Sequence, residues 1–340
     1  MRGDRLEVMM HLDNTLADTL PKLLKAPEQH WQPADYLPDL STEEGFEHMR
    51  VLREEAARLP EEILAVLVGD MITEEALPSY ASWIATLDGV NTQGEPNTAW
   101  GEWNRNWCAE ENRHGDLLNK YLYLTGRVNM KEVELTIHHL IKDGGQIETE
   151  NDPYRTFVYT SFQEIATRIS HLNVGKRALS AGAEHLYDLS RKIAGDEQRH
   201  ARAYMYFISK IMEVDPNEAV LAIHDMMKKK ITMPAMYMRE SGSKIGDAFK
   251  KFEVLATRHN IYTPHDYISI MSGLIKRWGI EHLTGLNPAA EKAQEYLCTL
   301  PERYRKILNR FAARDQKAID ESGPIEFSWV LPQQEKLGTG

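Results

Sequence analysis

The feature that most constrains the fold of this 340-residue chain is a pattern of seven residues that occurs twice, 86 positions apart. The first copy is Trp100, Trp103, Trp107, Glu111, His114, Leu118 and Tyr121, and the second is Leu186, Leu189, Ile193, Glu197, His200, Tyr204 and Phe207. Both copies advance in steps of three and four residues, so each lies on one face of an α-helix. Because these faces are apolar at both ends, we expect them to point into a protein core.

The middle of each apolar face carries a glutamate followed by a histidine one helical turn later, so the two side chains can reach a shared point. Burying two carboxylates and two imidazoles without compensation is costly. Hydrogen bonding within the core is one way to offset that cost, and it is the usual explanation of a single Glu-x-x-His. Two copies on equivalent faces favour a shared metal cation instead.

Ferritin-like carboxylate proteins hold two metal ions with a Glu-x-x-His from each of two helices and a single glutamate from each of two others. Glu164, within YTSFQEIATRISH, is the candidate single glutamate before the second copy. Before the first copy the candidates are Glu74 and Glu75. Spacing does not choose between them, and Thr-Glu-Glu is also a common helix start.

Composition narrows both the metal and the class of protein. Thirteen histidines and 51 acidic residues accompany only two cysteines, which excludes a disulfide framework and a multi-cysteine metal site. Oxygen-rich ligation with one imidazole per metal suits iron or manganese better than zinc or copper. The net charge of −11 argues against a general nucleic-acid binder. The longest apolar run, Ile63 to Val68, is too short to span a membrane, and we expect no membrane attachment. No intact targeting peptide is visible at the N-terminus.

The chain is predicted to form a single all-α domain, residues 1–340, with a ferritin-like helical bundle, extra helices and a short C-terminal β segment. Proline-rich residues 27–39 predict an extended stretch within an N-terminal arm, 1–41. Thr42 is expected to begin the first of the helices that build the bundle, 42–286. Residues 287–340 are expected to form C-terminal helices and a short strand, Ile325 to Leu331.

Several blocks of the sequence resemble the soluble acyl-acyl carrier protein desaturases of plant plastids. They include WCAEENRHGDLLNKYLYLTGRVNM, YTSFQEIATRISH, DEQRH, VGDMITEEALPSY, RWGIEHLTGL and FSWVL. The resemblance covers about Trp31 to Leu337. It implies a di-iron centre with Glu74 as the first ligand, and the full set of ligands it implies is Glu74, Glu111, His114, Glu164, Glu197 and His200. Glu111 and Glu197 would bridge the two irons.

The resemblance also implies roles around the metals. Asp196 and Arg199 would support the ligands, Thr167 would line the oxygen-binding side, and Trp31 would lie on the electron path. The implied reaction places a cis double bond in a saturated acyl chain on acyl carrier protein, with dioxygen and electrons from ferredoxin. The implied setting is the plastid stroma, as a homodimer.

The acyl chain is expected to enter an apolar tunnel. Its expected lining is Trp83, Thr86, Leu87, Ile147, Thr149, Thr156 and Phe157. Trp83, Ile147 and Thr156 stand where stearoyl enzymes of the family commonly hold Met, Pro and Gly. The bulkier Ile147 and Thr156 favour a chain of about 16 carbons, at roughly 1–3 kcal/mol per methylene, and we expect the bond at Δ4 or Δ6. A Δ9 stearoyl enzyme is the main alternative.

More distant alternatives are another di-iron hydroxylase or oxidase, an iron-storage bundle and a metal-free helical scaffold. Two acidic partners would need local basic surface on this acidic chain, and the candidates are Lys228, Lys229, Lys230, Lys244, Lys250 and Lys251. His171 shares a helix face with Glu164 and is interpreted as a structural hydrogen-bonding residue, with support of a metal ligand as the alternative. Cys108 is interpreted as a packed small side chain.

Overall fold

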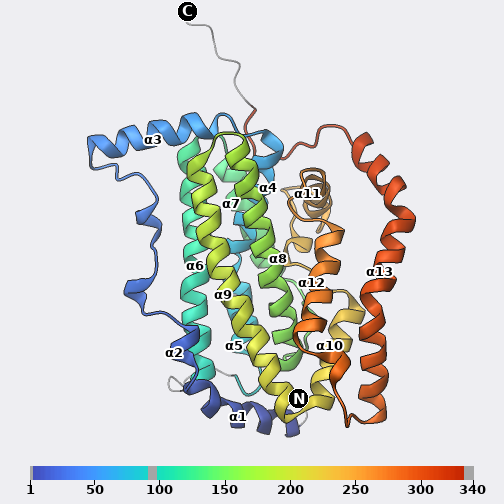
Figure 1. Ribbon diagram of the computed structural model, residues 1–340. Coiled ribbons are helices and arrows are strands. Elements are labelled where there is room, and N and C mark those ends of the chain that lie inside the picture. The colour runs from blue at the N-terminus through green and yellow to red at the C-terminus, as the bar shows by residue number, and fades with distance from the viewer. Residues whose placement is uncertain (1–2, 91–97, 333–340) are drawn as a thin grey trace, which may run out of the picture.

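The computed structural model describes residues 3–90 and 98–332, and it is built almost entirely of helices (Figure 1). Four of them form the centre of the bundle: α4 (Glu61–Glu75), α6 (Ala99–Thr125), α8 (Pro153–Ser180) and α9 (Glu184–Val214). α8 packs along α9, α4 packs along α6, and contacts between α4 and α8 and between α6 and α9 close the set. The expected all-α, ferritin-like bundle is therefore confirmed.

The remaining helices surround this centre. α3 (Glu43–Ala56) crosses one end of the bundle, α5 (Leu77–Ala85) continues from α4, and α7 (Met130–Asp143) packs on α4. α10 (Pro216–Lys229), α11 (Asp247–Arg258), α12 (Pro264–Arg277) and α13 (Pro288–Glu321) cover one side (Figure 1). Within this group α11 packs directly on α4. These outer helices leave the middle of the central four enclosed.

Side chains at the helix ends explain where the central helices begin. The side-chain oxygen of Thr98 accepts a hydrogen bond from the backbone N–H of Gly101 at the start of α6, and Asp152 caps α8 through the N–H of Tyr154. α6 ends at Thr125, and the next residue, Gly126, caps it with a φ of 69°, in the left-handed region that glycine adopts without strain. Thr42 caps α3 as the sequence predicts.

The two copies of the repeated pattern lie on α6 and α9, and all fourteen of their side chains are buried. Glu111 and Glu197 are 7% and 2% exposed, and His114 and His200 are 0% and 1% exposed. The prediction that both faces point into the core is confirmed. Each helix therefore delivers a carboxylate and an imidazole to the interior of the bundle.

Both ends of the chain differ in detail from expectation. Within the arm, α1 (Gly3–Ala17) and α2 (Leu20–Leu23) are helical, and Met9, Leu12 and Leu16 are buried against the bundle. Residues 27–39 contain only two short 3-10 turns, Pro27–Gln29 and Pro33–Asp35.

The prediction of a C-terminal strand from Ile325 to Leu331 is wrong. Among the described residues this segment makes only an isolated bridge, between Val128 and Val330. Trp329 anchors it instead, since its indole is fully buried and donates a hydrogen bond to Thr136. A single helix, α13, precedes it. No helix in the described ranges is long and apolar enough to cross a membrane.

Candidate metal centre

Six buried side chains from the four central helices meet in the middle of the bundle. α4 contributes Glu74, α8 contributes Glu164, and α6 and α9 contribute the two Glu-x-x-His pairs. They form two overlapping groups, in each of which the candidate ligand atoms lie within 4.8 Å of one another. The first group is Glu74, Glu111, His114 and Glu197, and the second is Glu111, Glu164, Glu197 and His200.

Glu111 and Glu197 belong to both groups, as expected of bridging carboxylates. Glu74 and Glu164 each belong to one group. Of the two glutamates that spacing left open, Glu74 lies in the cluster. The Glu75 side chain interacts with Asn119 instead.

The two histidines turn the same nitrogen toward the cluster. Nε2 of His114 lies 3.4 Å from Asp196, and Nε2 of His200 lies 2.8 Å from Glu110. These carboxylates accept the Nε2 protons, which assigns the lone pair to Nδ1. Nδ1 of His114 then lies 3.2 Å from oxygens of Glu111 and Glu197, and Nδ1 of His200 lies 2.6 Å from Glu111. Lone pairs that face carboxylates across such distances fit a cation between them.

The charges of the cluster lead to the same inference. Burial alone would lower the pKa of His114, but the Glu111 carboxylate and further hydrogen bonds raise it well above its usual range. Burial alone would also lower the pKa of His200, but the Glu111 carboxylate and further hydrogen bonds raise it well above its usual range. Burial, together with the charges of Glu111 and Glu197, raises the pKa of Glu164 well above its usual range. The site therefore requires positive charge, which either protons or metal ions can supply, and the residues present fit metal ions.

The outer carboxylates belong to a crossed network that spacing alone did not reveal in full. The residue before each glutamate that both groups share contacts the histidine of the other helix. Asp196 of α9 contacts His114, and Glu110 of α6 contacts His200. Arg199 donates to both Asp196 and Glu110, and Arg113 donates to Asp196 at 2.9 Å. Asp196 and Arg199 were predicted, whereas Glu110 and Arg113 were missed. The 86-residue offset maps them onto Asp196 and Arg199, and that signal would have found them.

The two single glutamates have different neighbours. Nε2 of His171 lies 2.9 Å from Glu74, so its hydrogen bond supports a candidate ligand, which was the less favoured of the two interpretations of this residue. Glu164 instead accepts a hydrogen bond from the indole of Trp107 at 3.1 Å. Thr167 lies one turn beyond Glu164, and its hydroxyl donates to Glu197 at 3.0 Å.

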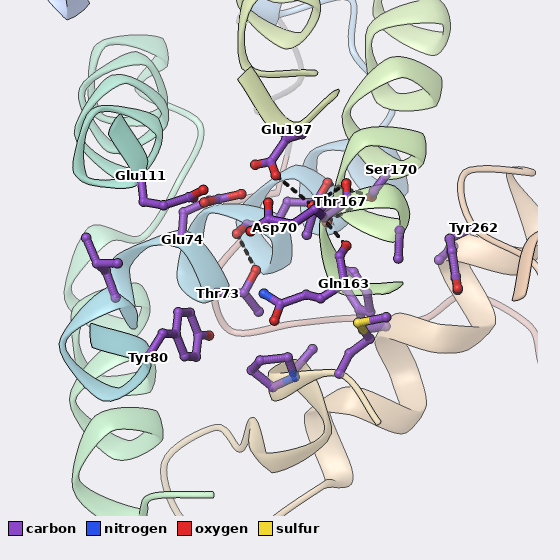
Figure 2. A pocket seen from close by; sticks show the side chains of 18 of the residues that line it. Asp70, Thr73, Glu74, Tyr80, Glu111, Gln163, Thr167, Ser170, Glu197 and Tyr262 are labelled. Atoms are coloured by element: carbon purple, nitrogen blue, oxygen red, sulfur yellow. Dashed lines mark hydrogen bonds between the residues drawn. The ribbon is translucent and has the colours of Figure 1, made fainter. Parts of the chain in front are cut away.

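A cavity opens directly beside the carboxylates (Figure 2). Its inner wall carries Glu74, Glu111, Glu164 and Glu197, together with Thr167. Its outer wall comes from α11 and the segments before and after it, and includes Met233, Pro234, Phe249, Phe252 and Tyr262. Asp70 also faces this cavity, where it accepts a hydrogen bond from Ser170 (Figure 2). Burial raises the pKa of Asp70 to about 6.

The predicted tunnel residues lie elsewhere. The described lining of this cavity includes none of the seven. Leu87, Ile147 and Phe157 are buried in an apolar cluster that also contains Trp100, Trp103 and Trp107, and Trp83 packs against it. Thr149 and Thr156 are buried, whereas Thr86 is exposed. Their role in a tunnel stays a prediction.

Trp31 lies against the first half of the cluster. Its ring stacks on His114, with centroids 6.0 Å apart and planes 12° apart, and its indole N–H donates to Asp196 at 2.9 Å. The guanidinium of Arg113 also lies over the Trp31 ring, with its central carbon 4.5 Å from the ring centroid. Trp31 is partly exposed, so it connects the cluster with the protein surface.

The remaining candidates lie outside the cluster. Lys228, Lys229 and Lys230 are exposed at the end of α10, and Lys229 pairs with Asp225. Lys250 pairs with Asp247, and Lys251 pairs with Glu240. Cys108 is partly buried, and burial raises the pKa of its thiol to about 12, which agrees with a packed, unreactive side chain.

The fold and the site together define a helical bundle with a buried carboxylate and histidine cluster built for metal ions. Comparison with known proteins agrees, because the profile of the fatty acid desaturase family matches residues 4–331. The chain therefore belongs to this family.

Characterised relatives match nearly the whole chain. It is 46% identical over 338 residues to stearoyl-[acyl-carrier-protein] 9-desaturase 2 of rice, Oryza sativa subsp. indica, covering 99% of this chain and 84% of the relative. It is also 46% identical over 335 residues to palmitoyl-[acyl-carrier-protein] 4-desaturase 3 of the orchid Ophrys sphegodes, covering 98% and 83%.

A solved structure shows the same fold. The X-ray structure of DesA2 from Mycobacterium tuberculosis H37Rv superposes with a TM-score of 0.53 at 17% identity. The match covers 84% of this chain and 99% of DesA2. At this identity the likeness concerns the fold alone.

Proposed function

We propose that this protein is an acyl-acyl carrier protein desaturase of the plastid stroma. It introduces a cis double bond into a saturated acyl chain on acyl carrier protein, using dioxygen and electrons from ferredoxin. The observation that carries the proposal is the six-residue cluster with an apolar-walled cavity opening on its carboxylates. Relatives whose names include both stearoyl 9-desaturases and palmitoyl 4-desaturases support the acyl carrier substrate, and their names place them in chloroplasts.

Two iron ions held by the six ligands would supply the oxidising chemistry with dioxygen. The protein's own contribution is to hold the ligands and the substrate in place. The crossed pairs His114–Asp196 and His200–Glu110 fix both imidazoles with Nδ1 inward. Thr167 offers a hydroxyl beside Glu197 at the cavity wall, where it can donate a hydrogen bond to a group bound there. Apolar walls such as Phe252 and Met233 exclude water and position an unactivated methylene.

We further propose that the preferred acyl chain has about 16 carbons, with the double bond at Δ4 or Δ6. The support is the bulk of Ile147 and Thr156, which are both buried outside the lining of the cavity, Ile147 within the apolar cluster that contains Trp100, Trp103 and Trp107. A Δ9 enzyme acting on stearoyl chains is the competing candidate, and relatives with both specificities match equally well.

One experiment tests the function and its specificity together. The iron-loaded protein is reduced without oxygen, exposed to dioxygen and supplied with C16 or C18 acyl carrier protein, and the products are analysed for double-bond position. We expect an unsaturated C16 product with the bond near the carboxyl end. A clean Δ9 preference for C18 would refute the specificity, whereas a hydroxylated product, or no product, would refute the desaturase function itself.

The acidic partners, acyl carrier protein and ferredoxin, are proposed to dock on local basic surface. Lys228 and Lys230 are exposed at the end of α10, close in sequence to Met233 and Pro234 of the cavity wall. Replacing both by Glu should slow association with acyl carrier protein and weaken its dependence on salt. Lys120, which is exposed and paired with Asp116, provides a matched control on α6. An unchanged KM at low salt would argue against this docking site.

We also propose a homodimer, as the resemblance to plant desaturases implies. Analytical ultracentrifugation of the metal-loaded protein tests it directly. A sedimentation coefficient of a 39.0 kDa species at micromolar concentration would contradict the proposal.

A further inference from the structure

An array of aromatic rings begins at the second half of the metal cluster. The indole N–H of Trp107 donates a hydrogen bond to the carboxylate of Glu164 at 3.1 Å. The ring of Tyr204 lies edge-on to Trp107, with centroids 6.2 Å apart, and Trp103 lies edge-on to Tyr204 at 5.6 Å. Trp103 also lies edge-on to the imidazole of His200, with ring centroids 6.5 Å apart. Two candidate ligands of the same half therefore touch the array.

The array continues outward to the protein surface. The ring centroid of Phe207 lies 5.1 Å from that of Trp103 and 5.1 Å from that of Trp100. Tyr206 lies 6.3 Å from Phe207 and is partly exposed, with its hydroxyl 3.1 Å from Thr19 and the ammonium of Lys210 above its ring. The inner members, by contrast, are almost completely buried. A continuous set of ring contacts thus leads from the cluster to a residue that small reductants can reach.

Tryptophan and tyrosine are the side chains that lose an electron most readily without being destroyed, and ring contacts of this kind let an electron pass from one to the next. We propose that Trp107, Tyr204 and Trp103 form a protective relay, which returns electrons to the oxidised metal centre when dioxygen has reacted without an acyl chain in place. The proposal rests on the proposed function only in requiring that the cluster activates dioxygen.

The electrons and protons of this side reaction balance. Reduction of one dioxygen to two waters needs four electrons and four protons. The reduced metal pair supplies two electrons, and the relay supplies the two that the acyl chain would otherwise have given. Each relay electron leaves Trp107 and is replaced through Trp103 and Tyr204 from Tyr206, which loses its phenolic proton to solvent. A small-molecule thiol or ascorbate returns one electron and one proton to Tyr206. The four protons for water come from solvent.

The surroundings of the rings indicate where the missing electron rests. Glu164 would be ionised as a ligand of bound metal ions, and its carboxylate, which accepts the hydrogen bond of the Trp107 indole, would then favour a positive charge on that ring over one on a ring without such a neighbour. Burial raises the pKa of Tyr204 well above its usual range. No described carboxylate or imidazole accepts a hydrogen bond from its phenol, so Tyr204 does not readily lose its proton. Within the buried part of the array, the oxidised state should therefore reside on the tryptophans and not on Tyr204 before it reaches Tyr206.

The experiment uses the iron-loaded protein, chemically reduced and mixed with dioxygen in the absence of acyl substrate. Samples frozen at millisecond to second intervals are examined by electron paramagnetic resonance, with ring-deuterated tryptophan to assign the radical. We expect a tryptophan radical in the natural sequence and a severalfold smaller yield in Trp107→Phe and in Trp103→Phe. Trp329→Phe is the matched control, because Trp329 is equally buried but lies in the other apolar cluster.

Trp107→Phe also removes a hydrogen bond to a candidate ligand, so its iron content is measured alongside. In the described part of the chain the Trp103 indole donates no hydrogen bond to a candidate ligand, so the Trp103 variant carries the test if Trp107→Phe fails to fold or to bind iron. Peptide mass spectrometry after repeated oxidation is the second measurement. In Trp103→Phe, oxidative damage should move from the array to His200 and its neighbours.

The absence of any tryptophan radical in the natural sequence would overturn the relay, and so would equal radical yields and damage patterns in Trp103→Phe and Trp329→Phe. These outcomes are distinct from failure of the proposed function. Desaturated product without a radical would leave the function intact and refute the relay. A radical without desaturated product would support the relay and refute the function.

Discussion

The two halves of the metal cluster have matching ligands but very different surroundings. On the first half, Glu74 accepts from His171, and His114 stacks on the partly exposed Trp31. On the second half, Glu164 accepts from Trp107 and His200 touches Trp103, both of which are buried. The repeat thus supplies four of the six candidate ligands, while the residues around them differ between the halves. We propose that the first half receives electrons and protons and that the second holds an oxidant in apolar surroundings.

Glu111 and Glu197 are the glutamates that the two halves share, so their loss should have the largest effect. Glu111→Ala removes a carboxylate common to both groups, whose oxygens lie 3.2 Å from Nδ1 of His114 and 2.6 Å from Nδ1 of His200. We expect the protein to lose the paired iron and essentially all desaturation. Iron stoichiometry, the absorption of the bridged pair and product formation measure the result. Glu110→Ala, at the preceding residue, is the control that should retain more iron. Normal iron content with normal turnover in Glu111→Ala would disprove the site.

Asp70 lies one turn before Glu74 on α4, so it provides a test of the electrostatics around the first half. Burial raises the pKa of this carboxyl from 3.8 to about 6 in the metal-free protein. An acid whose pKa is raised in the folded state contributes stability that is present below pH 4 and is lost as the pH rises toward 6. Asp70→Asn removes this loss and can still accept from Ser170. We expect the metal-free variant to be more stable by about 3 kcal/mol at pH 7 and equal in stability near pH 3.5.

Denaturant unfolding of both proteins across this pH range measures the difference. Bound cations would lower the pKa of Asp70, so the gain should shrink in the iron-loaded protein. A pH-independent difference between the two proteins would show that Asp70 is not the titrating group. Ser170→Ala is a useful companion, because it removes the hydrogen bond to Asp70 without removing its charge.

The outer carboxylates give a smaller effect, and they compare the halves directly. Asp196→Asn and Glu110→Gln each weaken the acceptor for one histidine Nε2, and each should lower iron affinity or turnover by about 10- to 100-fold. Asp196 also accepts from Trp31 and Arg113, so its variant should additionally slow reduction by ferredoxin. Chelator competition measures the affinity, and stopped-flow reduction measures the rate. Equal reduction rates in the two variants would remove the proposed asymmetry.

Much of this site could be predicted from the sequence, because helical periodicity fixes which residues share a face. The six cluster residues follow from two copies of Glu-x-x-His and the glutamates upstream of them. Glu110 and Arg113 were not predicted, because they are polar residues at the edge of the apolar face and the pattern of apolar positions does not include them. The repeat nevertheless relates them to Asp196 and Arg199. The choice of Glu74 over Glu75 depends on how α4 is rotated against α6, which spacing does not determine.

The ends of the chain were harder to predict, because tertiary contacts decide their structure. α1 gains its stability by burying Met9, Leu12 and Leu16 against the bundle, and its sequence alone gives only a weak amphipathic pattern. Ile325 to Leu331 has the composition of a strand. In the described part of the chain it finds only one bridging partner, Val128, and the buried Trp329 holds it in place.

Trp31→Phe should have the smallest effect and decides whether electrons enter by the first half. Phenylalanine can still stack on His114 and beneath Arg113, but it cannot donate to Asp196 and is far harder to oxidise. We expect ferredoxin to reduce the iron severalfold more slowly, with iron content unchanged and with unchanged reduction by a small chemical reductant that can reach the metals directly. Trp103→Phe is the matched variant on the second half and should leave ferredoxin-driven reduction unaltered. If both variants slow it equally, or neither does, the two halves do not divide the work in this way, and the difference in their surroundings serves packing alone.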